Sequence, residues 1–187
     1  MLEIELKLKV DSLKPTSQKL AQLGAKFDGD YLQTDAYYDD SDDSLINSDR
    51  CLRIRKHKNH LGEAIELTYK GARENHRFKS RREIGLKVEK AAELAELFGE
   101  LGYKERLVIE KKRSLWDYHD CKVALDELPL LGYFVEIEGP DDDTIEQAQK
   151  ELGLGNLKHI PQSYAHLMEE AIAKTGSKKR KITFGQK

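Results

Sequence analysis

The sequence predicts an α+β fold built on an eight-stranded antiparallel β-barrel, closed or nearly closed, with helices packed outside. Three observations support this prediction. Segments that alternate strictly between apolar and charged residues dominate the chain, short turns join most of them, and helical segments separate a few of them. Closing such a sheet removes the edge strands that otherwise promote aggregation.

The first strand has the clearest pattern, because Leu2–Val10 alternates apolar and charged residues without interruption. Similar alternation predicts further strands at about 31–39, 50–57, 63–71, 77–87, 106–116, 120–127 and 132–138. Helical patterns, the first three followed directly by a glycine that can end a helix, lie at Leu13–Leu23, Ala91–Leu101, Thr144–Leu152 and Gln162–Lys174.

Domain organisation is simple, because no Pro-, Gly- or Ser-rich linker divides the 187 residues. We expect residues 1–174 to form one domain. Residues 175–187 contain the basic run Lys178–Lys181 and are expected to be a poorly ordered, solvated tail. A binding site for a phosphate-rich partner is the alternative interpretation of this run.

The charge balance limits the classes of partner. The chain has 32 Lys and Arg against 34 Asp and Glu, a formal net charge of -2, although 35% of its residues are charged. Proteins that bind nucleic acid non-specifically usually carry a clear basic excess, so no nucleic-acid partner is expected. The chain also has no apolar run near the roughly 20 residues that a membrane span needs, so no membrane partner is expected.

The two cysteines, Cys51 and Cys121, have neither CxxC spacing nor a nearby cluster of histidines. We expect both to lie in strands as small apolar residues. The N-terminal segment is charged throughout and does not resemble a secretory signal, so a reduced, cytoplasmic location is expected.

The charged faces of the strands are the most informative feature for function. Residues at i and i+2 share a strand face, so Glu3 lies with Glu5 and Lys7, Arg53 with Arg55, and Glu136 with Glu138. The same rule aligns further charged side chains, namely Glu66 with Lys70, Arg81 with Glu83, and Lys111 with Arg113, while Asp126 lies opposite Leu125. A single face of this kind is usually solvated, which is the alternative for each strand.

Several such faces directed into one barrel would create an acidic side and a basic side. Burying like charges together is costly and shifts their pKa values unless an opposite charge joins them. A divalent metal with a polyphosphate relieves both costs, because Mg²⁺ and Mn²⁺ prefer carboxylate and phosphate oxygens, while Arg and Lys bind the remaining phosphate oxygens. The chain contains no P-loop, GxGxxG, HExxH or GxSxG motif that would indicate another chemistry.

The order of these residues resembles the CYTH superfamily, also called triphosphate tunnel metalloenzymes. The resemblance covers about residues 1–170 and rests on ordered motifs: Glu3-x-Glu5-x-Lys7, Gln33-Thr34-Asp35-x-Tyr37-Tyr38-Asp39, Leu52–Arg55, Leu67–Gly71, Arg81–Glu83, Glu110–Ser114, Leu125–Glu127, Val135–Glu138 and Ser163-Tyr164. The sequence is most similar to the class IV adenylate cyclase branch. Inorganic and thiamine triphosphatases share the same scaffold.

The resemblance implies an eight-stranded tunnel whose charged side chains point inward and which holds Mg²⁺ or Mn²⁺. It implies a main set of metal-binding carboxylates, Glu3, Glu5, Glu136 and Glu138, with Glu83 and Asp126 helping to hold a second metal or its waters. It also implies a triphosphate-binding set, Lys7, Arg53, Arg55, Lys70, Arg81, Lys111 and Arg113. Lys7, Glu3 and Glu5 are the expected catalytic residues, Lys7 by assisting proton transfer.

One position departs from the family pattern. Gln162 stands before the Ser-Tyr of the last helix, where the family often has Lys or Arg, and Lys158 is the nearest basic substitute. The function expected by resemblance is adenylate cyclase activity, ATP to cyclic AMP and pyrophosphate. The alternatives are hydrolysis of tripolyphosphate, thiamine triphosphate or a nucleoside triphosphate, and a non-catalytic module that binds polyphosphate or nucleotide. Dimers are common among such tunnels, so a homodimer is a further expectation.

Overall fold

The structure is a computed structural model, and it describes residues 2–74 and 77–185. In that part of the chain the strands are β1 (Leu2–Val10), β2 (Lys26–Asp39), β3 (Cys51–Asn59), β4 (Gly62–Glu74), β5 (Lys79–Val88), β6 (Lys104–Tyr118), β7 (Cys121–Leu128), β8 (Gly132–Gly139) and β9 (Lys181–Ile182). The helices are α1 (Lys14–Gln22), α2 (Ser44–Asn47), α3 (Ala91–Glu100), α4 (Asp142–Glu151) and α5 (Tyr164–Thr175).

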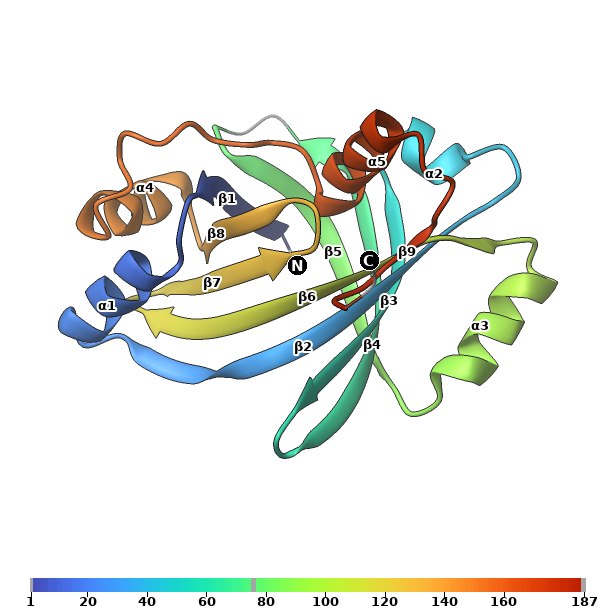
Figure 1. The fold of residues 1–187 in the computed structure, drawn as a ribbon, viewed down its shortest axis with the longest axis horizontal. Coiled ribbons are helices and arrows are strands. Elements are labelled where there is room, and N and C mark those ends of the chain that lie inside the picture. Colours follow the sequence, from blue (N-terminus) through green and yellow to red (C-terminus); the bar gives the residue numbers. More distant parts are fainter. Residues whose placement is uncertain (1, 75–76, 186–187) are drawn as a thin grey trace.

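Strands β1 to β8 form one sheet that closes on itself (Figure 1). Around the ring the order is β2-β3-β4-β5-β1-β8-β7-β6, and every neighbouring pair is antiparallel. The long pairing of β2 with β6, from Lys26 with Asp117 to Asp39 with Lys104, closes the ring. The predicted eight-stranded antiparallel barrel with helices outside it is confirmed.

The apolar faces of the strands point away from the barrel and form the hydrophobic core with the helices. Leu8, Val123 and Ile137, from three different strands, are 0% exposed and pack in one cluster with Leu20 of α1 and Ile145 of α4. A second cluster joins α3, through Phe98, to the outer faces of β2 and β3. The alternation of the sequence therefore directs the charged faces inward, which is the reverse of a common half-buried sheet.

Helix α5 lies across one end of the barrel. Its side chains Tyr164, Met168 and Ile172 pack in a third cluster with Leu128 and Phe134. Phe134 shares a strand face with Glu136, and Leu128 shares one with Asp126, so α5 is seated against inward-facing residues. Ser163 caps this helix by accepting a hydrogen bond from His166 N at 3.2 Å.

The structure contains two short elements and one strand extension that the sequence pattern does not predict. Helix α2 has four residues and strand β9 has two, which is too few for a periodic pattern. Strand β2 begins at Lys26, before the expected start near residue 31, because Lys26–Tyr31 continue the pairing with β6. The remaining boundaries agree with the alternation to within a few residues.

The sequence predicts a poorly ordered tail from residue 175 onward, and the structure differs from this prediction over residues 181–185. Lys181 and Ile182 pair in parallel with Val108 and Ile109 of β6, and Ile182 is buried in the α5 cluster. The last two residues of the expected tail lie outside the described part of the chain. No helix among the described residues is long and apolar enough to cross a membrane.

The outward position of the core predicts a clear stability difference between two leucines. Leu8→Ala should lower the free energy of unfolding by about 2–5 kcal/mol, because it leaves a cavity between β1 and the covering helices. Leu61→Ala, at a position 81% exposed, should change it by less than about 0.5 kcal/mol. Urea unfolding followed by circular dichroism measures both, and equal losses would contradict the assignment of the core.

Candidate active site

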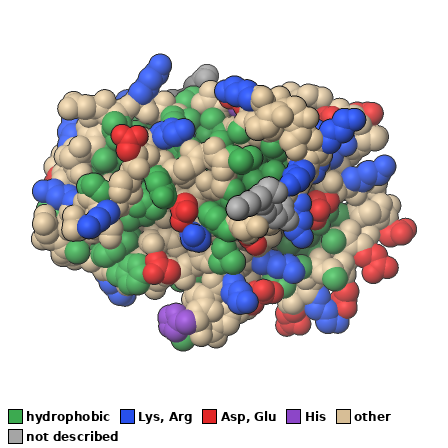
Figure 2. Space-filling model, viewed as in Figure 1, with side chains coloured by type: hydrophobic (Ala, Val, Ile, Leu, Met, Phe, Trp, Pro, Cys, Tyr) green, Lys and Arg blue, Asp and Glu red, His purple; other side chains and the backbone are tan. Residues whose placement is uncertain are grey.

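A cavity of about 1090 Å³ occupies the interior of the barrel. Its lining includes every predicted site residue except Asp126: Glu3, Glu5, Lys7, Arg53, Arg55, Lys70, Arg81, Glu83, Lys111, Arg113, Glu136 and Glu138. These residues come from six strands, β1, β3, β4, β5, β6 and β8, and closure of the barrel brings them together. The outer surface of the molecule also carries both signs of charge, with Lys, Arg, Asp and Glu interspersed over the face shown in Figure 2.

The acidic part of the cavity comes from the adjacent strands β1 and β8. Their register places Glu5 directly opposite Glu138 and Lys7 opposite Glu136. Like charges at directly opposed positions repel, so the Glu5–Glu138 pair is unfavourable without a cation. Burial, together with the charges of Glu5, Glu83 and Glu136, raises the pKa of Glu138.

Glu3 shows the same excess of negative charge. Burial is the main reason that its pKa rises to about 7, Glu5 and Glu83 add to the rise, and Lys70 opposes it. Carboxylate oxygens are the donors that Mg²⁺ and Mn²⁺ prefer, so the cluster has the donor chemistry for a divalent cation. In this structure, lysines pair with Glu3 and Glu5 instead. No group of three or more His, Cys, Asp or Glu side chains among the described residues is arranged to hold a metal ion.

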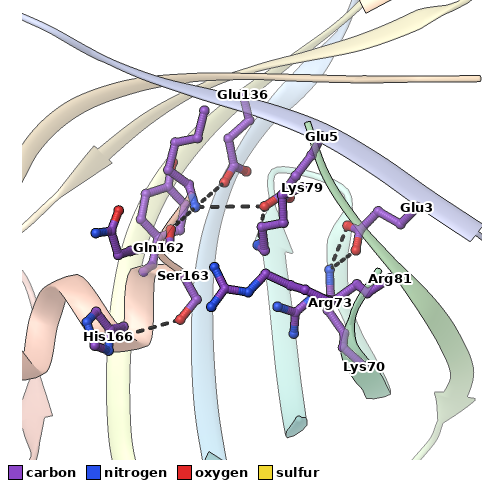
Figure 3. A network of polar contacts seen from close by, with 12 residues as sticks. Glu3, Glu5, Lys70, Arg73, Lys79, Arg81, Glu136, Gln162, Ser163 and His166 are labelled. Carbon is purple, nitrogen blue, oxygen red and sulfur yellow. Dashed lines mark hydrogen bonds and ion pairs between the residues drawn. The ribbon is translucent and has the colours of Figure 1, made fainter. Parts of the chain in front are cut away.

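Lysines are paired with these carboxylates. Lys70 Nζ lies 2.6 Å from both oxygens of Glu3 and 2.8 Å from Glu83 Oε2. Lys79, which the sequence analysis missed, forms an ion pair with Glu5 (Figure 3). Burial lowers the pKa of Lys79 in spite of this partner. The sequence could have identified Lys79 as a cavity residue, because it lies two residues before Arg81, on the same face of the predicted strand.

Lys7 lies where the acidic strands meet α5. Its Nζ is 3.3 Å from Glu136 Oε1 and 3.9 Å from Glu5 Oε1, and it donates a hydrogen bond to the carbonyl oxygen of Gln162 at 2.9 Å. The ammonium also lies 4.2 Å from the centre of the Tyr164 ring, at cation–π distance. The side chain is 2% exposed, so these contacts fix the ammonium inside the cavity.

The basic part of the cavity is centred on Asp35 of β2. Arg55 donates to both of its oxygens, at 2.5 and 2.6 Å, while Arg53 and Lys111 approach to 3.8 and 3.9 Å. Although burial opposes ionisation, these three cations hold the pKa of Asp35 well below its usual range. Three cations around one carboxylate leave a local surplus of positive charge. The sequence analysis included Asp35 in a motif but gave it no role.

Asp126 lies behind Arg113 and is not among the residues lining the cavity. Arg113 donates to both oxygens of Asp126, at 2.6 Å from Nε and 2.5 Å from Nη2, and also contacts Glu136. The hydroxyl of Tyr164 donates to Asp126 Oδ2 at 2.8 Å. Asp126 is 0% exposed and is therefore placed to orient Arg113 and Tyr164. Asp126 and Glu136, another expected metal ligand, both accept from Nη2 of Arg113.

Some lining residues are exposed to solvent, among them Asn47 at the end of α2, Pro161 before α5 and His166 in α5, and we call this solvent-facing part of the lining the mouth of the cavity. His166 of α5 lines the cavity there, together with Gln162 and Ser163 just before that helix (Figure 3). Lys158, the expected basic substitute, is not among the lining residues. Arg73 and Arg106, which sequence reasoning missed, line the cavity from β4 and β6. Each is paired, Arg73 with Asp49 at 2.6 Å and Arg106 with Asp43.

Comparison with known proteins places this arrangement in a family. Residues 1–164 match the model of the CYTH domain. The chain belongs to the CYTH domain family. A curated relative from Methanocaldococcus jannaschii, named "Putative adenylate cyclase", is 32% identical over 147 residues, which is 79% of this chain and 82% of the relative.

Solved structures share the CYTH fold seen here. A Pyrococcus horikoshii OT3 protein has a TM-score of 0.79 at 28% identity, with 90% of this chain and 98% of that chain covered. A Hippeastrum protein, described as a "putative adenylyl cyclase" that reveals a dominant triphosphatase activity, has a TM-score of 0.66 at 15% identity over 94% of this chain and 96% of its own. At that identity the likeness shows the fold alone.

The pKa of Glu3 gives a test of the acidic cluster. In the metal-free protein its carboxyl should titrate at about pH 7 in a carbon-detected NMR experiment, and the signal should be absent in Glu3→Gln. Since the folded pKa lies above the unfolded value, the stability that protonated Glu3 contributes is present at low pH. It is lost as the pH rises from about 4.5 to 7. A titration midpoint near 4.5 would contradict the charge excess described here.

Proposed function

We propose that the chain is a divalent-metal-dependent enzyme that acts on a triphosphate inside the barrel, and that its reaction is the conversion of ATP to cyclic AMP and pyrophosphate. The observation that supports this most is the pairing of two opposite charge imbalances in one cavity. Arg53, Arg55 and Lys111 surround a single carboxylate. On the acidic side, burial and neighbouring carboxylates raise the pKa values of Glu3 and Glu138 although Lys70 lies nearby, which marks a surplus of negative charge. A metal–triphosphate complex supplies both missing charges.

The cationic side chains have the geometry to bind the phosphates. Arg53, Arg55 and Lys111 are held by Asp35, and Arg113 is held by Asp126, so their positions are fixed before a ligand arrives. Fixed cations stabilise charge that develops on a transferring phosphoryl group without having to reorganise. A bound Mg²⁺ or Mn²⁺, held by Glu5 and Glu138 with help from Glu3, Glu136 and Glu83, would neutralise phosphate oxygens and activate the nucleophile.

In the proposed cyclase reaction, the ribose 3′-oxygen bonds to the α-phosphorus and the bond from that phosphorus to the β-phosphate oxygen breaks. Pyrophosphate leaves with the electron pair of the broken bond. The hydroxyl proton needs an acceptor, and the carboxylates that line the cavity are the candidate bases. Lys7, fixed between Glu136 and Gln162, would stabilise the charge on the phosphate oxygens.

Hydrolysis of a triphosphate is the second candidate, because the same cavity would serve if water replaced the ribose hydroxyl. The Hippeastrum protein of the same fold is described as a dominant triphosphatase. The size of the cavity, about 1090 Å³, favours a substrate larger than inorganic triphosphate, which alone would fill only part of such a space.

A product assay distinguishes these reactions. The purified protein is incubated with ATP or with tripolyphosphate, in Mg²⁺ or Mn²⁺, and the products are separated by ion-exchange chromatography. A cyclase should release cyclic AMP and pyrophosphate in equal amounts from ATP and leave tripolyphosphate intact. Release of orthophosphate from either compound would favour the triphosphatase, and binding without turnover would favour a non-catalytic module.

The acidic residues of the cavity should be required for turnover. Glu5→Gln should reduce kcat by at least about 100-fold, because it removes one carboxylate of the proposed metal site. Glu63→Gln, an exposed position in β4 that does not line the cavity, is the matched control and should retain activity. Near-normal turnover by Glu5→Gln, with thermal unfolding showing an intact fold, would reject this assignment.

A further inference from the structure

The residues beyond the CYTH match contribute an ordered segment to the mouth of the cavity. We define residues 177–185 as the C-terminal arm. The arm pairs with β6 through Lys181 and Ile182, and Val108 N donates a hydrogen bond to the carbonyl oxygen of Arg180 at 2.7 Å. In Figure 1 it turns back from α5 and runs beside β6 toward the end of the chain.

Two side-chain contacts anchor the arm after Arg180. Ile182 is 8% exposed and packs among Leu107, Ile109, Met168 and Ile172, which belong to β6 and α5. Further along, Phe184 N donates to Glu110 Oε2 at 2.9 Å, and Lys112 Nζ lies 4.3 Å from the centre of the Phe184 ring. These contacts hold the backbone of the arm against the strand that also carries Lys111 and Arg113.

This docking places Arg180 at the cavity. Its side chain lines the mouth together with Arg106 of β6 and His166 of α5. Arg180 differs from the neighbouring arginines in its charge partner. Arg73 and Arg106 are each paired with an aspartate, whereas no salt bridge joins Arg180 to a carboxylate within the described ranges 2–74 and 77–185. An exposed arginine without a carboxylate partner at the mouth of an anion site is available to the anion.

We propose that the C-terminal arm is part of the substrate site and that Arg180 binds an outer phosphate of the triphosphate at the cavity mouth. The proposal rests on the proposed triphosphate function and adds a residue outside the segment that matches the family model, residues 1–164. Guanidinium and phosphate form charge-assisted, often bidentate hydrogen bonds, and Arg180 adds such a donor to a lining that has the uncharged Gln162 just before α5. Ile182 acts through Arg180 as a positioning residue.

The test measures binding of tripolyphosphate, with MgCl₂ present, to the full chain by isothermal titration calorimetry. Arg180→Ala should weaken binding about three- to tenfold, and Arg180→Lys should restore part of the loss because it keeps the charge. Lys178→Ala is the matched control, since it removes the same charge from the same arm at an exposed position that does not line the cavity. It should change the affinity by less than about twofold.

A double-mutant cycle tests the role of docking. Ile182→Asp places a charge in the apolar cluster and should release the arm, so it should weaken binding about as much as Arg180→Ala. Combining the two should cause no further loss, because Arg180 in a released arm is no longer at the mouth. Circular dichroism and thermal unfolding check that each variant is folded. If Ile182→Asp does not fold, the affinity of Arg180→Ala alone tests the proposal.

Salt dependence separates a phosphate contact from a structural effect. The difference between the wild type and Arg180→Ala should shrink as NaCl is raised from about 20 to about 300 mM, because an exposed ion pair is screened. Equal affinities of Arg180→Ala and Lys178→Ala, with tripolyphosphate bound by the wild type, would overturn the role of Arg180 alone. Failure of the wild type to bind tripolyphosphate or ATP would overturn both this role and the proposed function.

Discussion

The structure depends on burying two opposite sets of charges inside one closed sheet. An ionised side chain in the interior of a barrel is tolerated only if an opposite charge or hydrogen-bond partner compensates for its lost hydration. Asp35 with Arg55, Glu3 with Lys70, and Asp126 with Arg113 provide that compensation in pairs that join different strands. The same pairs fix the positions of the cations and carboxylates that a ligand would meet.

An interior filled with charge moves the hydrophobic core to the outside of the barrel. The outward faces of β1, β7 and β8 are covered by α1 and α4, and those of β2 and β3 by α3. Because stability comes from these outer layers, the interior does not have to be packed with apolar side chains and retains a cavity. The compensation inside is incomplete, with Glu5 opposite Glu138 and three cations around Asp35, and this charge pattern is the basis of the proposed metal–triphosphate site.

Alternation in the sequence predicts most of the fold and most of the charged residues that line the cavity, because a strand fixes which residues share a face. It fails where an element is too short to show a period, as in α2 and β9, and where a role depends on a partner from another strand. Lys79 and Asp35 acquire importance only through Glu5 and Arg55. Asp126 belongs to a predicted face, but Arg113 and Tyr164 separate it from the cavity.

The sequence by itself determined the strand order along the chain, the faces that carry charge, and the match to the CYTH pattern. It left open whether those faces meet solvent or one another, since alternation is the same in both cases. Pairing of β2 with β6 decided this by closing the sheet. Only that closure brings Glu3, Arg55 and Lys111 to one cavity, and only the docking of the chain's end on β6 brings Arg180 to its mouth.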